Sequence, residues 1–297
     1  MTGKRIAFVL AAAAALLCAS SAQAGIFGKH DAKKPAGSDD AAVKQIQQAI
    51  DEQRYLDAGR MLDQVILAGG KDPRLTLLAG DLDLVHSRWG DALADFKRGE
   101  TAPDGIGQAY QGEGIALSAL GRSDEAVAML QKAVAQDPSA WRAWDALGVE
   151  FDNQKQWTEA EAAYDHAMID SGSSPIVLNN RGYSRLLQHR ADEAVADFVA
   201  ALKKKPDFAE ARTNLRLAIA MKGDYTRATA GGEPSEQAAL LNNAGFAAAM
   251  RGDYAQAEDL LDQAMRAKGE YYARAADNMK VVEGLKAQDK AAPNGAH

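Results

Sequence analysis

The chain has 297 residues, of which 47% are hydrophobic and 25% are charged, and its net charge at pH 7 is −7. Such a composition is ordinary for a soluble globular protein, and an acidic surface argues against general nucleic-acid binding. Eight prolines and 6% aromatic residues, with alanine and leucine common, favour helices over strands. The composition therefore predicts an all-α fold.

Residues 1–24 have the features of a secretory signal peptide. Lys4 and Arg5 give a positive start, residues 6–17 form a short apolar core, and residues 22–24 (Ala-Gln-Ala) form a small-x-small cleavage site. An apolar core of this length is too short to be a permanent membrane span. We therefore expect cleavage after Ala24 and a periplasmic mature protein.

Cys18 offers an alternative, because a bacterial lipoprotein carries its lipid on a cysteine near the cleavage site. Lipoprotein signals normally place Gly, Ala or Ser before that cysteine, and Leu17 stands there instead. A lipid-anchored form is thus the less favoured reading. Cleavage after Ala24 would leave no cysteine, hence no disulfide and no thiolate metal site, and a net charge of −9. No later stretch is long and apolar enough to cross a membrane.

Residues 141–175 contain a pattern that sets the organisation of the chain. Small or apolar residues fall at positions 4, 7, 8 and 11 of this unit, and again at positions 20, 24 and 27. Each set lies on one face of a helix. Gly148 and Ala160 are small enough to let two helix backbones approach, and Trp144, Phe151 and Tyr164 would fill the space beside that contact.

This pattern resembles the tetratricopeptide repeat (TPR), a pair of antiparallel helices recurring about every 34 residues. Units starting at residues 39, 73, 107, 141, 175 and 209 keep the register, and a seventh starts near residue 238. Position 20 is alanine in the first six: Ala58, Ala92, Ala126, Ala160, Ala194 and Ala228. The resemblance implies a TPR solenoid, a right-handed superhelix of about seven helix pairs. We expect a flexible lead-in at 25–38, the array at 39–271, a capping helix at 272–288 and a disordered tail at 289–297.

Two units depart from the pattern. In the sixth, Gly231, Gly232 and Pro234 interrupt the second helix. In the fifth, Arg181 and Arg185 occupy positions that normally hold apolar residues. We expect their stems to pack while the charged ends reach solvent, with a local change of packing as the alternative.

The sequence contains no constellation of side chains suited to catalysis or to metal binding. None of the five histidines is paired with another at i, i+4 spacing, and the carboxylates are scattered over outward helix faces. The glycine pairs around Gly105 and Gly112 lack the strand and the Lys-Ser/Thr of a phosphate loop. We therefore expect no enzymatic activity and no cofactor.

In TPR proteins, positions 2, 5, 9, 12 and 13 of each unit face a groove that binds a partner polypeptide. From the third unit onward position 9 is apolar, and position 5 often carries an amide or a carboxylate. The candidate groove residues are Ile115, Asp145, Val149, Asn179, Tyr183, Leu186, Leu217, Met221, Asn242 and Phe246. An extended peptide or an amphipathic helix is the expected ligand. The alternatives are that the stripe packs within the array, or that the groove binds the chain's own lead-in or tail.

Residues 209–284 carry a further resemblance. The segment from Ala211 to Tyr225, the interrupted helix with Pro234 and the asparagine-rich helix that follows are similar to TadD-type TPR proteins, which assist assembly of Flp (tight-adherence) pili. The resemblance implies a role in pilus or secretion-system assembly, with membrane association through partners. The alternatives are an adaptor for outer-membrane protein or cell-wall machinery, or an accessory subunit of a periplasmic enzyme.

Overall fold

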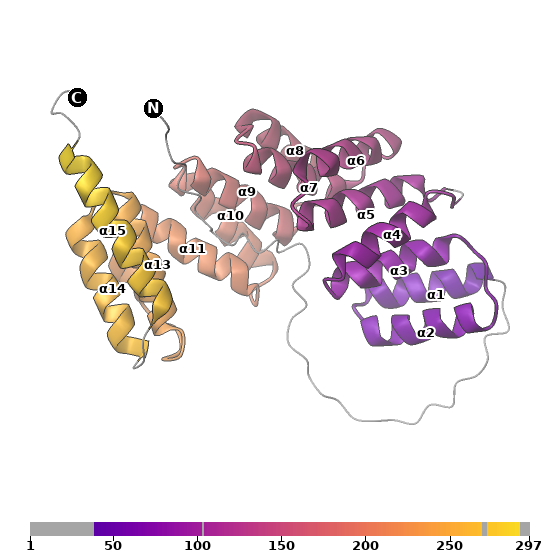
Figure 1. Cartoon of the computed structure of the whole chain (residues 1–297), viewed down its shortest axis with the longest axis horizontal. Coiled ribbons are helices and arrows are strands. Elements are labelled where there is room, and N and C mark those ends of the chain that lie inside the picture. The colour runs from indigo at the N-terminus through magenta and orange to yellow at the C-terminus, as the bar shows by residue number, and fades with distance from the viewer. Residues whose placement is uncertain (1–38, 103, 269–271, 292–297) are drawn as a thin grey trace. The chain divides into compact units, whose positions relative to one another are not determined.

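The computed structural model describes residues 39–102, 104–268 and 272–291, and over these ranges the chain forms α-helices and no strand (Figure 1). The all-α prediction is confirmed. The expected signal peptide, the lead-in and residues 292–297 lie outside the described residues. The helices are α1 (Asp39–Asp51), α2 (Tyr55–Leu67), α3 (Arg74–Val85), α4 (Trp89–Gly99), α5 (Ile106–Ala119), α6 (Ser123–Gln136), α7 (Trp141–Asn153), α8 (Trp157–Asp170), α9 (Pro175–Leu187), α10 (Ala191–Lys204), α11 (Ala209–Met221), α12 (Tyr225–Thr229), α13 (Gln237–Met250), α14 (Tyr254–Lys268) and α15 (Ala273–Ala291).

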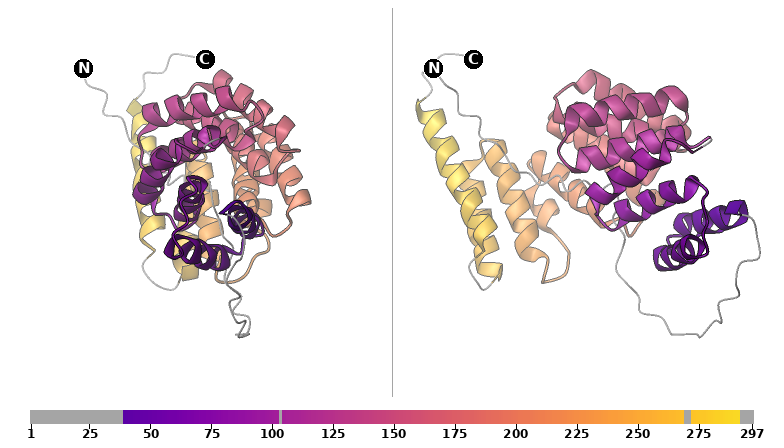
Figure 2. Two further views of the ribbon diagram at one scale, coloured as in Figure 1. Left: turned by 90° about the vertical axis from the view of Figure 1, so that its right-hand side faces the viewer. Right: turned by 45° about the vertical axis from the view of Figure 1, so that its right-hand side comes forward.

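The helices form two compact units, the first ending at Asp170 and the second beginning at Ser171. The first unit contains α1 to α8, and the second contains α9 to α15. Within each unit, helices pair in sequence order, and the first helix of each pair also contacts the first helix of the next pair. At the C-terminal end, α13, α14 and α15 run side by side, as the right-hand view in Figure 2 shows in orange and yellow.

In the second, third, fourth, fifth and seventh pairs, a glycine on the first helix packs against a large side chain on the second. The first pair has the buried Ile46 at this position instead. A Cβ atom on Gly148 would lie 2.6 Å from the ring of Tyr164, which is 1% exposed. Trp144 and Phe151 are only partly buried beside this contact. The same close approach occurs at Gly80–Phe96, Gly114–Leu130, Gly182–Phe198 and Gly245–Leu261. The predicted role of the position-8 glycine is therefore confirmed.

The sixth pair is the irregular one, because its second helix, α12, has only five residues. Gly231 and Gly232 both have positive φ angles after it, a conformation that a helix does not continue. Arg216 occupies the place of the glycine on α11. Its Nη1 atom donates to the carbonyl oxygens of Ala228 at 3.1 Å and Ala230 at 2.7 Å. The guanidinium group thus supplies hydrogen bonds to carbonyl oxygens at the C-terminal end of the shortened helix.

The last helix, α15, covers the end of the second unit. Val282 is fully buried, and Met279 and Leu285 pack against the same core, as the sequence predicted for a capping helix. It ends at Ala291 rather than at residue 288, and Lys286 pairs with Glu258 of α14 at 2.5 Å.

The expectation that Arg181 and Arg185 reach solvent is wrong. Both guanidinium groups pair with Asp197 of α10, Arg181 at 2.8 Å and Arg185 at 2.7 Å. The side chain of Asp197 is 6% exposed and those of the two arginines are 16% and 13% exposed. A buried ion-pair cluster therefore lies between α9 and α10, in addition to the Gly182–Phe198 contact of this pair.

Candidate peptide-binding faces

Two rows of apolar side chains run across the first helices of the second unit, α9, α11 and α13. Position 9 is Tyr183, Leu217 and Phe246, and all three are half-buried. Position 13 holds Leu187, Met221 and Met250. Leu187 is 39% exposed and Met250 is 41% exposed, and these two are among the most exposed large apolar residues of the unit. We call these six residues the C-terminal apolar face.

The other candidate residues of this unit are buried. Leu186 is part of the core formed with Phe198. Asn179 accepts a hydrogen bond at 3.0 Å from Nδ2 of Asn214 on the next first helix, and Asn242 accepts one at 2.9 Å from Nδ2 of Asn278. These two asparagines therefore link neighbouring helices, and a partner's backbone would have to compete with those bonds.

The remaining three candidates belong to the first unit. Ile115 is 6% exposed within the core, and Asp145 is 2% exposed. Val149 is half-buried on the same helix as Asp145. The ten predicted residues are thus divided between the two units, three in the first and seven in the second.

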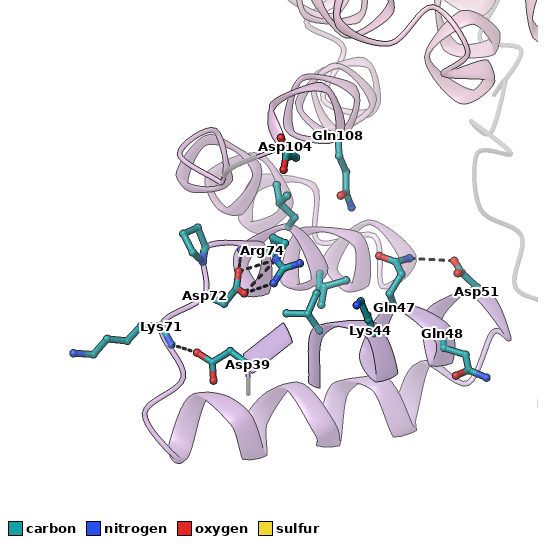
Figure 3. A pocket seen from close by; sticks show the side chains of 15 residues that line it. Asp39, Lys44, Gln47, Gln48, Asp51, Lys71, Asp72, Arg74, Asp104 and Gln108 are labelled. Carbon is teal, nitrogen blue, oxygen red and sulfur yellow. Dashed lines mark hydrogen bonds and ion pairs between the residues drawn. The ribbon is translucent and has the colours of Figure 1, made fainter. Parts of the chain in front are cut away.

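The first unit has a pocket of about 900 Å³, here called the N-terminal pocket, on the side formed by α1, α3 and the start of α5 (Figure 3). Its lining includes Gln47, Asp51, Arg74, Leu77 and Gln108. Figure 3 shows the Gln108 side chain pointing into the pocket, toward Gln47. A second pocket of about 660 Å³ shares Asp104 and Gln108 with it and extends the hollow to the start of α7.

Amide side chains orient the carboxylates around the N-terminal pocket. Gln47 Nε2 donates to Asp51 Oδ1 at 3.1 Å, and Gln108 Nε2 donates to Asp81 Oδ2 at 2.9 Å. Burial raises the pKa of Asp81 to about 7, against the hydrogen bond from Gln108 and the positive charge of Arg142, while the charge of Asp51 adds to the rise. A cation near this carboxyl group would favour its ionised form.

Sequence reasoning missed the N-terminal pocket although its residues follow the same positional rule. Gln47 and Asp51 stand at positions 9 and 13, and Arg74, Gln108 and Arg142 at position 2. The groove prediction rested on apolar residues, and these residues are polar. Their positions in the repeat, taken without regard to polarity, predict that they face the same groove.

Another unexpected titratable group, Glu113, is buried on α5 at a position that normally holds an apolar residue. It is 2% exposed, and within the described residues its Oε1 atom has no hydrogen-bond partner. Burial, a hydrogen bond with Glu100 and the charge of Glu100 raise the pKa of Glu113 to about 7, and Lys97 and Lys132 partly oppose the rise.

Glu113→Gln should therefore make the first unit more stable than wild type at pH 8, but not at pH 5. The folded-state pKa of about 7 lies above the usual value of 4.5, so the carboxyl group's contribution to stability is lost as pH rises between these values. The difference in free energy of unfolding between variant and wild type should change by about 1–3 kcal/mol between pH 5 and pH 8. Urea unfolding at both pH values measures it. The control is Glu125→Gln, because pairing with Arg122 lowers the pKa of Glu125; an equal response of both variants would contradict the assignment.

The described residues hold no cluster of three or more His, Cys, Asp or Glu side chains placed to bind a metal ion. Over the same ranges, none of the helices has both the length and the apolar character that a bilayer span needs.

Residues 112–175 and 179–230 match the model of the tetratricopeptide repeat family. The helix pairs of this stretch are tetratricopeptide repeats. The matched region runs from the third pair into the sixth, and the glycine contacts extend the same packing to the second and the seventh. A comparison with curated proteins finds no match.

Solved TPR structures share the fold. The Cut9–Hcn1 hetero-tetramer of the APC/C aligns with a TM-score of 0.63 at 15% identity, over 82% of this chain and 49% of that chain. This chain therefore spans about half the length of that neighbour. A TPR protein from Parabacteroides merdae aligns with a TM-score of 0.52 at 14% identity, covering 82% of this chain and 98% of the other. The thermophilic TPR protein TTC0263 from Thermus thermophilus aligns with a TM-score of 0.53 at 19% identity, covering 61% and 99%.

At these identities the likeness shows the TPR fold alone. A TPR array is generally a non-catalytic scaffold for protein–protein interaction, because stacked helix pairs present a long surface of repeated side-chain positions. In the described part of this chain, such a surface is apolar at the C-terminal apolar face and hollowed at the N-terminal pocket.

Proposed function

We propose that this chain is a non-catalytic periplasmic scaffold that binds a segment of a partner protein on its C-terminal apolar face. The observation that carries the proposal is the repetition of apolar side chains at positions 9 and 13 of three successive first helices, where they stay partly exposed. A single exposed apolar residue needs no explanation, whereas a repeated row of them is typical of an interaction surface.

The chemistry of this face fits an amphipathic helix or an extended segment that presents regularly spaced apolar side chains. Tyr183 and Phe246 supply rigid aromatic surface, which suits anchor positions at an interface. Met221 and Met250 supply flexible, polarisable surface that adapts to the shape of a partner.

The test is a cross-linked pull-down from intact envelopes, read by mass spectrometry, with wild type and the double variant Tyr183→Ala/Phe246→Ala. We expect the variant to capture at least about tenfold less of the main partner, while its helicity by circular dichroism is unchanged. The matched control is Val199→Ala, since Val199 is a 50% exposed apolar residue on α10 of the same unit. Undiminished capture by the double variant would reject this face, and a loss of helicity would assign Tyr183 and Phe246 to the core.

The net charge of the first unit favours a basic stretch of the partner as a second contact, with the N-terminal pocket as its place of binding. Residues 39–170 contain 24 acidic and 12 basic residues, a net charge of −12, whereas residues 171–297 contain 16 and 17, a net charge of +1. Such an asymmetry draws a positively charged segment to the acidic unit, and the attraction weakens as salt is added. Asp51→Asn in the same pull-down reports on this contact.

The process we propose is assembly of Flp-type pili or of a related secretion system. It is supported by the resemblance of residues 209–284 to TadD-type proteins and by the signal-peptide features of residues 1–24. Deletion should then remove surface pili, and the captured partner should be a pilus or secretion component. Capture of outer-membrane protein machinery, cell-wall machinery or a periplasmic enzyme would instead select one of the alternative roles.

A further inference from the structure

Helix α2 presents an outer face with the most exposed apolar side chains in the described chain. Leu56 is 80% exposed and Leu67 is 86% exposed, with Ile66 beside them at 51%. The opposite side of the same helix is ordinary core, formed by fully or nearly buried residues. The exposed leucines are therefore not a sign that α2 is poorly packed; they belong to a second, separate face.

This outer face is a continuous stripe. Leu56, Arg60, Asp63 and Leu67 are spaced i, i+4, i+7 and i+11, which places them on one side of a helix. The stripe is about 16 Å long at the usual helical rise. Gly59 lies along its edge, and a Cβ atom built there would have no atom within 4 Å. The helix is thus open to close approach of another backbone. None of the residues lining the N-terminal pocket belongs to α2.

The order of side chains along the stripe is self-complementary. If a second α2 is laid antiparallel across the first, Leu56 faces Leu67 of the second copy and Arg60 faces Asp63 of the second copy. The twofold axis repeats both contacts, as in an isologous interface. Arg60 has a 74% exposed side chain, paired within its own helix with Asp57, and Asp63 is exposed. Both charges are therefore available at the surface.

We propose that the outer face of α2 is the contact surface of a homodimer with an antiparallel α2–α2 pair at its centre. A second copy of this chain would bury the leucines at both ends of the stripe and pair the charged residues in its middle. A single helix pair is a small interface, so the dimer should be weak, with a Kd on the order of 10–100 µM.

Sedimentation velocity of the purified chain at about 1 to 200 µM tests the proposal across the expected Kd. We expect a concentration-dependent shift from monomer to dimer. Leu56→Lys/Leu67→Lys should remain monomeric over the same range with unchanged helicity. Arg60→Asp and Asp63→Arg should each weaken dimerisation at least about tenfold, and the double variant Arg60→Asp/Asp63→Arg should restore it, because the swapped charges pair again across the axis.

A wild-type chain that stays monomeric throughout would overturn the proposal, as would a dimer that persists in the leucine variant. If the wild type is monomeric and the amides of α2 are protected from hydrogen exchange, a segment of the same chain covers the face instead. Capture of the partner on the C-terminal apolar face is measured separately, so failure of the dimer leaves the proposed function standing.

Discussion

Replacing Asp197 with alanine should destabilise the second unit by about 3–5 kcal/mol. The change removes the carboxylate that both Arg181 and Arg185 contact at 2.7–2.8 Å, and the two guanidinium groups stay in a site where their side chains are 16% and 13% exposed. Two like charges close together in a poorly hydrated site are costly. Chemical unfolding followed by circular dichroism measures the loss, which should fall on the transition of the second unit.

A triple variant separates the cost of leaving two arginines without Asp197 from the net contribution of the whole ion-pair cluster to stability. Arg181→Leu, Arg185→Leu and Asp197→Leu together restore apolar residues between α9 and α10, and the result should be at least as stable as wild type. An Asp197→Ala variant that loses less than about 1 kcal/mol would mean that the cluster is hydrated, and the buried ion pair would no longer be a reasonable description.

Gly112→Ala should destabilise the first unit by about 2–3 kcal/mol, although alanine is normally the better helix former. The ring of Phe96 is fully buried and lies against Gly80 of α3 and Gly112 of α5. A Cβ atom on Gly112 would stand 2.3 Å from that ring. The complementary change, Phe96→Ala, empties the same space and should cost about 3–5 kcal/mol.

The matched control for Gly112 is Gly90→Ala on α4, where nothing lies within 4 Å of the added atom. It should be neutral or stabilising by up to about 1 kcal/mol. Thermal unfolding of both variants measures whether the change in stability is negative for Gly112→Ala and zero or positive for Gly90→Ala. Equal effects of the two alanines would show that the helices move apart at little cost, which would contradict close packing at the glycine.

Much of the fold could be predicted from the sequence because the repeat places the same kind of contact at the same position. The Gly148–Tyr164 approach and the early end of α12 both follow from residues that act locally. The buried cluster around Asp197 could not be predicted, because spacing on α9 does not reveal which side chain of α10 faces it. From position alone we predicted that Arg181 and Arg185 are exposed to solvent, whereas both pair with Asp197.

The candidate faces were predictable to different degrees. Half-burial of Tyr183 and Leu217 follows from position 9, whereas the burial of Asn179 depends on the asparagine of the next helix that it contacts. The N-terminal pocket depends on how the turn before α3 meets α1, where Arg74 pairs with Asp40 at 2.9 Å. The repeat positions therefore predict which residues face the hollow, but they do not predict which of those residues form an ion pair.

The five-residue α12 affects how the second unit resists disruption. In an array of repeats each pair gains its stability from its neighbours, so cooperativity is only as strong as its weakest boundary. Here α13 packs directly on α11, with Arg216 holding the short helix between them through two carbonyl oxygens. We therefore expect local unfolding of the second unit to begin at residues 225–236, where a five-residue helix stands in place of a full second helix.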